Sequence, residues 1–119
     1  MKNVLVVMTN PVAGREDEFN DWYENQHIAD VLALPGFVGA QRFELGDGQV
    51  GPELSPQGYH RYLVLYEIEI DPAAALQILG EAVEQGRVPV SPALDLASTA
   101  QWSFEAIGPP VAAMAGSER

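Results

Sequence analysis

His27 and Asp30 are the residues whose types and spacing most suggest chemistry, because they fall on the inward side of a predicted helix. At ~100° per residue, one third of the circumference of a helix that begins near residue 16 includes the six side chains that bear on this interpretation. These are Phe19, Tyr23, His27, Asp30, Val31 and Leu34. Ionisable groups on an inward-facing arc cost free energy unless they are partnered or used. We therefore interpret His27 as the leading candidate for a general acid or base.

A short hydrogen-bonded row around His27 would equip this residue for proton transfer. An imidazole with a pKa of about 6.5 exchanges protons near neutral pH. Asp30, one turn later, could accept from one ring nitrogen and fix the tautomer, while the Tyr23 hydroxyl, one turn earlier, could complete the row. The structural alternative is that His27 ties the helix to a backbone carbonyl and that Asp30 faces water near the helix end.

Four further residues are candidates for substrate binding. They are Trp22, Phe43, Tyr66 and Arg42. The aromatic rings would shape an apolar pocket, although aromatic residues at such spacing also serve as ordinary core. Tyr66 lines the cleft if its strand face meets the helices, and otherwise stacks in a dimer interface. Arg42 could bind a carboxylate or enolate oxygen, or could pair with Glu44 or Glu67 at the surface.

The elements that must position these residues follow the order strand, helix, strand, strand, helix, strand. Apolar or alternating runs predict strands over residues 4–8, 37–45, 61–70 and 99–107. The first helix ends before Pro35, and the second begins at Asp71-Pro72 and ends at Gly86. This order predicts an α+β, ferredoxin-like βαββαβ fold, in which a four-stranded antiparallel sheet carries two helices on one face. A second copy would cover the other apolar face, so we expect a homodimer.

One domain over residues 1–110 and a C-terminal tail over residues 111–119 describe the whole chain. Its 119 residues suffice for one core and are too few for two. The tail has small residues without a hydrophobic period, so it is frayed or reaches to a partner. The stretch over residues 46–60 is a long loop, either an exposed excursion or a lid.

The composition of the chain excludes several classes of partner. Asp and Glu number 17 against 6 Lys and Arg, a net charge of -11 that repels phosphate backbones and anionic lipids. We therefore expect no nucleic-acid and no membrane partner. Cysteine is absent, and the histidines and carboxylates lack the spacing of metal ligands, so we expect no metal. No apolar segment is long enough for a signal peptide core or a membrane span, which favours a cytoplasmic protein.

One stretch of the chain resembles a known superfamily. It contains Trp22-Tyr23, His27, Asp30-Val31, Leu34-Pro35-Gly36-Phe37 and Gln41-Arg42-Phe43. This pattern resembles the dimeric α+β barrel superfamily, and within it the EthD-like proteins. The resemblance implies two ferredoxin-like protomers with facing sheets, and a cleft between helices and sheet in each. Such proteins include cofactor-independent monooxygenases, polyketide cyclases, muconolactone isomerases and haem-degrading enzymes, so the resemblance does not choose a reaction.

Haem is implied by this kinship alone, with His27 as its axial ligand. The acidic character of the chain disfavours holding the haem propionates. We therefore expect no cofactor.

Together these observations predict a small-molecule enzyme with cofactor-independent acid/base chemistry, of the oxygenase, cyclase or isomerase type. Its substrate would be a small hydrophobic molecule, aromatic or enolisable. His27 would move the proton, and Tyr23 and Asp30 would hold His27 in place. One alternative is a non-catalytic protein that binds a hydrophobic metabolite in a catabolic or stress pathway. Another is an interaction protein whose dimer is its whole role.

Overall fold

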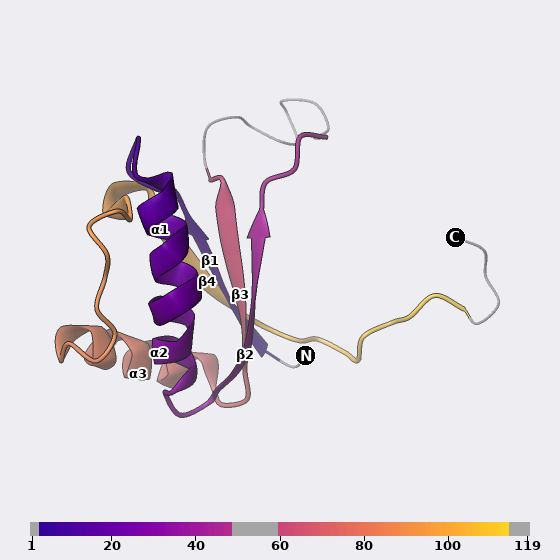
Figure 1. Cartoon of the computed structure of the whole chain (residues 1–119). Coiled ribbons are helices and arrows are strands. Elements are labelled where there is room, and N and C mark those ends of the chain that lie inside the picture. Colours follow the sequence, from indigo (N-terminus) through magenta and orange to yellow (C-terminus); the bar gives the residue numbers. More distant parts are fainter. Residues whose placement is uncertain (1–2, 49–59, 115–119) are drawn as a thin grey trace.

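A four-stranded antiparallel sheet with its helices on one side forms the body of the protein in the computed structural model (Figure 1). The structure describes residues 3–48 and 60–114. The strands are β1 (Asn3–Thr9), β2 (Phe37–Glu44), β3 (Tyr62–Ile68) and β4 (Ala100–Glu105). Their order in the sheet is β2-β3-β1-β4, and every neighbouring pair is antiparallel. The predicted strands and the predicted fold class are confirmed.

The first helical segment is continuous but changes its winding in the middle. α1 (Glu16–Trp22) passes into a π-helical turn, η1 (Tyr23–His27), which passes into α2 (Ile28–Leu32). The amide of Ile28 donates to the carbonyl of Tyr23, five residues earlier, as a π turn requires. The sequence predicted one regular helix here, so the wider turn is a correction to that prediction.

The second helix, α3 (Pro72–Glu84), begins and ends where the sequence predicts. The Asp71 carboxylate accepts from the Ala74 amide at 3.2 Å and so satisfies one of the free donors at the helix start. Gly86 follows the helix end with a φ of 77°, a conformation that glycine adopts at little cost. A short 3₁₀ turn, η2 (Leu96–Ser98), then precedes β4.

The core fills the space between the helices and one face of the sheet. Side chains alternate along β1 and β3, and every second one is buried. The buried set on these two strands is Leu5, Val7, Thr9, Val64, Tyr66 and Ile68. Phe19, Tyr23 and Val31 pack against them from the helical segment. Tyr66 therefore faces the helices, which settles the question that its sequence left open.

The other face of the sheet, which we call the open face, carries a set of apolar side chains. Strand register places on it Val4, Val6, Met8, Phe43, Leu63, Leu65, Trp102 and Phe104. Trp102 is 51% exposed and Phe104 is 55% exposed. Exposed apolar side chains gathered on one sheet face form the type of surface that a partner molecule can bury.

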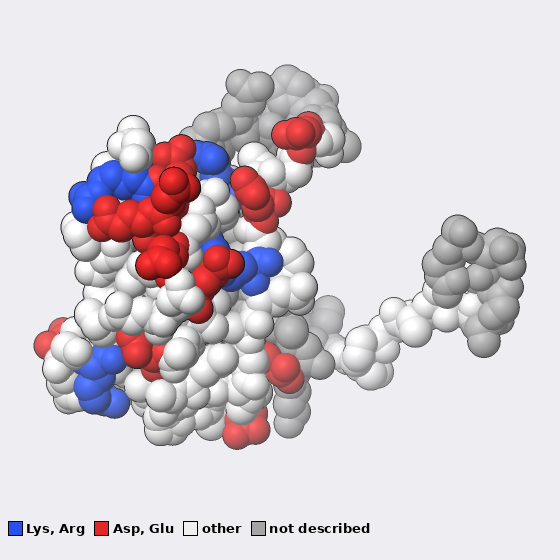
Figure 2. Space-filling view, viewed as in Figure 1, with Lys and Arg blue, Asp and Glu red and all other residues white. Residues whose placement is uncertain are grey.

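After β4 the chain runs away from the body (Figure 1). Residues 106–114 form no helix or strand and are exposed, whereas most of the predicted 46–60 loop, residues 49–59, lies outside the described residues. No helix in the described ranges is long and apolar enough to cross a membrane. Figure 2 shows acidic side chains gathered over α1, whose first turn holds Glu16, Asp17 and Glu18.

Candidate functional site

A cavity of about 550 Å³ lies between the sheet, the helical segment around His27 and α3. Its walls are formed by Val7, Thr9, Tyr23, His27, Val31, Tyr66, Leu76, Leu79, Gly80, Val83, Val90, Leu94, Leu96, Thr99 and Gln101. Most of these side chains are apolar, and none of them carries a formal charge at neutral pH. A cavity of this size with a few polar groups suits a small, largely apolar molecule.

His27 lies in the cavity wall between two aromatic rings. Its imidazole stacks on the Trp22 indole with centroids 4.3 Å apart and an interplanar angle of 29°. The Tyr23 ring meets it edge-on at 5.1 Å. Burial lowers the pKa of His27 to about 4, and the nearby Asp30 charge offsets this only in part. At neutral pH the imidazole is therefore uncharged, and it is a weaker base than an imidazole in water.

The π turn brings both aromatic residues against His27. In a regular α-helix, residues three or four apart share a face. The wider turn also aligns residues five apart, so that Trp22 as well as Tyr23 contacts the imidazole. Regular helical spacing predicts only the contact with Tyr23. The signal that could have shown the second contact is the adjacent pair of aromatic residues four and five positions before the histidine.

The hydroxyl-bearing side chains of Thr9, Tyr23 and Tyr66 line the cavity close to one another. Burial raises the pKa of both tyrosines, so their phenols stay protonated. The Thr9 side chain lies close enough to Tyr23 to lower the pKa of the Tyr23 phenol. Among the described residues, however, the Thr9 hydroxyl has no partner that meets the geometric criteria for a hydrogen bond. The Tyr66 hydroxyl and His27 Nδ1 are also buried without a partner among those residues. Such unpaired polar atoms cost free energy that a ligand oxygen could restore.

Asp30 acts on His27 through its charge alone. The carboxylate raises the pKa of the imidazole slightly, against the larger effect of burial. His27 Nδ1 has no hydrogen-bond partner within the described chain. The predicted row from Tyr23 through His27 to Asp30 is thus not closed by a hydrogen bond at this nitrogen.

Arg42 and Phe43 lie outside the cavity lining. Neighbouring strand residues point to opposite faces, so Phe43 lies on the open face and is 44% exposed. Arg42 faces the helices, where its Cζ lies 4.8 Å from the centroid of the Tyr23 ring. Its expected partners were Glu44 or Glu67, whereas the observed ion pair is a long one, 4.0 Å, with Glu24.

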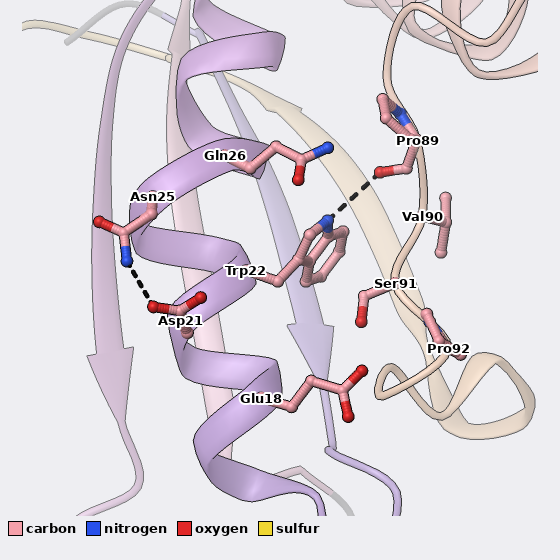
Figure 3. A pocket seen from close by; sticks show the side chains of 9 residues that line it. All are labelled: Glu18, Asp21, Trp22, Asn25, Gln26, Pro89, Val90, Ser91 and Pro92. Atoms are coloured by element: carbon pink, nitrogen blue, oxygen red, sulfur yellow. Dashed lines mark hydrogen bonds between the residues drawn. The ribbon is translucent and has the colours of Figure 1, made fainter.

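A second hollow of about 430 Å³, the outer groove, lies on the far side of Trp22 (Figure 3). Its walls are Glu18, Asp21, Trp22, Asn25, Gln26 and residues 89–92. The indole Nε1 donates to the Pro89 carbonyl at 3.3 Å, and this bond joins the two walls of the groove (Figure 3). Val90 lines both the groove and the cavity. Trp22 thus shields His27 from the groove instead of shaping the cavity directly.

Known proteins resemble this chain in structure. No protein-family model and no curated protein matches its sequence. The heme-degrader MhuD from Mycobacterium tuberculosis, solved with two hemes in its active site, matches with a TM-score of 0.61 at 21% identity, over 92% of this chain and 99% of that chain. An EthD (ethyl tert-butyl ether d) family protein from Bacillus halodurans matches with a TM-score of 0.61 at 13% identity, over 90% of this chain and 100% of that chain. HapK from Hahella chejuensis matches with a TM-score of 0.52 at 17% identity, over 94% of this chain and 99% of that chain.

The chain has the ferredoxin-like α+β fold. The predicted resemblance to dimeric α+β barrel proteins, including the EthD-like branch, is thereby confirmed at the level of fold. At these identities the likeness carries no reaction over to this chain.

Haem, which MhuD binds, does not suit the described cavity. Its two propionates call for cationic partners, and none of the lining residues is a lysine or arginine. The described lining therefore does not fit haem. No group of three or more His, Asp or Glu residues able to hold a metal ion occurs within the described ranges either.

Proposed function

We propose that the protein is a small-molecule enzyme that transfers a proton on an aromatic or enolisable substrate, with His27 as the acid/base and without a cofactor. One observation carries this proposal. An uncharged imidazole and two protonated phenols, Tyr23 and Tyr66, line the same apolar cavity of about 550 Å³. A base and hydrogen-bond donors on one cavity wall are the two components that enolisation needs.

The mechanism assigns a different task to each group. His27 accepts a proton from the carbon next to a carbonyl group, and the oxygen, as it becomes an enolate, accepts hydrogen bonds from the Tyr66 and Tyr23 hydroxyls. The low pKa of the free imidazole favours the neutral form that can act as a base. The negative charge of the enolate raises the proton affinity of His27 during the step, because an opposite charge nearby favours the imidazolium.

The assembly that we propose is a homodimer in which two open faces pack together. Trp102 and Phe104 supply exposed aromatic surface at the β4 edge, and Phe43 supplies it on β2. Burial of such surface against a second copy is favourable by roughly 25 cal/mol per Å². The cavity faces the helices, so each protomer keeps its own site.

Hydrogen exchange on a simple ketone tests the proton transfer without knowledge of the natural substrate. 2-Tetralone in D₂O is incubated with the protein, and loss of its α-protons is followed by NMR. We expect the protein-dependent rate of exchange to be about a hundredfold lower for the His27→Ala variant, because this is the usual contribution of a general base. His60→Gln is the matched control, because His60 contacts the Ser98 carbonyl and is not among the lining residues of the cavity.

A binding measurement separates the enzyme from a non-catalytic binding protein. The chain has two tryptophans, so a Trp102→Phe variant leaves Trp22, stacked on His27, as the fluorescent reporter. We expect 1-naphthol to quench this fluorescence and to bind about tenfold more tightly than 1-methoxynaphthalene, which cannot donate a hydrogen bond. Binding without exchange of 2-tetralone would favour the binding protein. Absence of both would overturn the site.

A further inference from the structure

Arg42 places a positive charge directly behind the cavity without lining it. Its Cζ lies 4.8 Å from the Tyr23 ring centroid, 5.5 Å from that of Tyr62 and 5.9 Å from that of Phe19. Only 18% of its side chain is exposed. Tyr23 lines the cavity, and its aromatic ring lies against the Arg42 guanidinium. The cation therefore lies behind a ring whose hydroxyl belongs to the cavity wall.

The contacts of Arg42 do not neutralise its charge. Nη2 donates to the Asn20 Oδ1 atom at 2.7 Å, which is a bond to an uncharged amide. The carboxylate of Glu24 is 4.0 Å from Nη1 and 64% exposed, so water screens this ion pair. Nε is buried without a partner among the described residues. A partly buried guanidinium without a close counter-ion is costly, so the charge of Arg42 acts mainly on the aromatic rings that surround it.

Polar and charged groups lie around Tyr23 on β1, β2, β3 and its own helical segment. Thr9 faces it from β1, Tyr66 from β3, Arg42 from β2 and His27 from its own helical segment. Because His27 is neutral, Arg42 is the charged residue among these four neighbours of Tyr23. Its charge lowers the pKa of both Tyr23 and Tyr66, against the larger effect of burial. The same field favours any negative charge that forms at their hydroxyls.

We infer that Arg42 is a positioning residue that acts through Tyr23 and stabilises negative charge on a ligand oxygen bound at the Tyr23 and Tyr66 hydroxyls. The ligand class is therefore a phenol or enol that ionises in the cavity. The assignment of a phenol or enol oxygen as the ligand atom rests on the proposed function. The effect of the Arg42 charge on the Tyr23 phenol does not depend on that function.

The effect on Tyr23 can be measured without any ligand. 3,5-Difluorotyrosine is placed at position 23, and its ionisation is followed by ¹⁹F NMR against pH. We expect Arg42→Gln to lower the ionisation constant of this phenol about tenfold, and Arg42→Lys to restore most of it. Arg42→Met, which keeps the apolar part of the side chain, replaces the Gln variant if that variant does not fold.

Arg61→Gln is the matched control for this measurement. Arg61 also lies over a tyrosine, with its Cζ 5.5 Å from the Tyr62 ring centroid, but it is exposed and pairs with Glu16 at 3.2 Å. We expect less than a twofold change for it. An equal effect of the Arg42 and Arg61 variants, or no effect of Arg42→Gln in a folded protein, would overturn the inference. So would a failure of Arg42→Lys to restore the ionisation constant.

A second measurement concerns the ligand itself. The ionisation of 1-naphthol bound to the protein is followed by absorbance, and we expect Arg42→Gln to lower its ionisation constant about tenfold as well. If 1-naphthol binds but its ionisation constant is the same in the wild type and in Arg42→Gln, the inference is overturned and the proposed function is unaffected. Failure of naphthol to bind the wild-type protein would count against the proposed function, while the fluorotyrosine result would still decide the role of Arg42.

Discussion

Trp22 and His27 stack on each other across one π turn, with ring centroids 4.3 Å apart and planes inclined by 29°. The indole is itself held by a hydrogen bond from Nε1 to the Pro89 carbonyl. Ring packing, rather than a hydrogen bond at Nδ1, therefore orients the imidazole in the described structure. This environment excludes water from one face of the ring and opposes its protonation.

The stability of the protein should depend on pH through His27. Its pKa is 6.5 when unperturbed and about 4 in the folded protein, so the unfolded chain binds the proton more readily. Stability from this residue is present above pH 6.5 and is lost as the pH falls toward 4, by roughly 3 kcal/mol at most. Urea unfolding of the wild type and of His27→Gln at pH 7.5 and pH 4 measures this loss.

The wild type and the His27→Gln variant must be compared because many carboxylates titrate in the same pH range. Their contribution is common to both, so the difference between the two pH dependences isolates His27. The His27→Gln variant should lose clearly less stability on acidification than the wild type. Equal losses would mean that the folded imidazole titrates near its ordinary pKa.

Trp102→Glu should separate the proposed dimer into monomers. Trp102 lies opposite Val6 on the open face and is 51% exposed in the single chain. A carboxylate buried in an apolar interface should raise the dissociation constant about thirtyfold or more. Light scattering after size exclusion measures the mass. Ala73→Glu, on the exposed first turn of α3, is the control that should remain dimeric. A wild-type protein that is monomeric at high concentration would contradict the assembly.

Gly36→Ala should destabilise the protein by about 2 kcal/mol, because φ is 86° at this position and a Cβ atom would lie 2.5 Å from the Ile70 side chain. The turn between α2 and β2 needs this conformation. Gly80→Ala, in the middle of α3 with open space around its Cβ position, should instead stabilise by up to about 1 kcal/mol. Urea unfolding of both variants tests the contrast, and equal effects would refute it.

Local patterns were sufficient for the order of the elements and for the inward position of His27. Hydrophobic alternation predicted all four strands to within two residues at either end. Asp71-Pro72 and Gly86 marked the limits of α3, because capping and backbone geometry are properties of a few neighbouring residues. Helical spacing also placed Tyr23 and His27 on one arc, and they do contact each other.

The sequence by itself therefore determined the ferredoxin-like order of strands and helices and the candidate base. Only the tertiary structure decided that Tyr66 lines the cavity, that Phe43 lies on the open face and that Arg42 packs behind Tyr23. Alternation shows that neighbouring strand residues point in opposite directions, but which of two apolar faces meets the helices depends on packing between distant segments. The π turn that joins Trp22 to His27 was not predicted, because the regular helical period places only Tyr23 against His27.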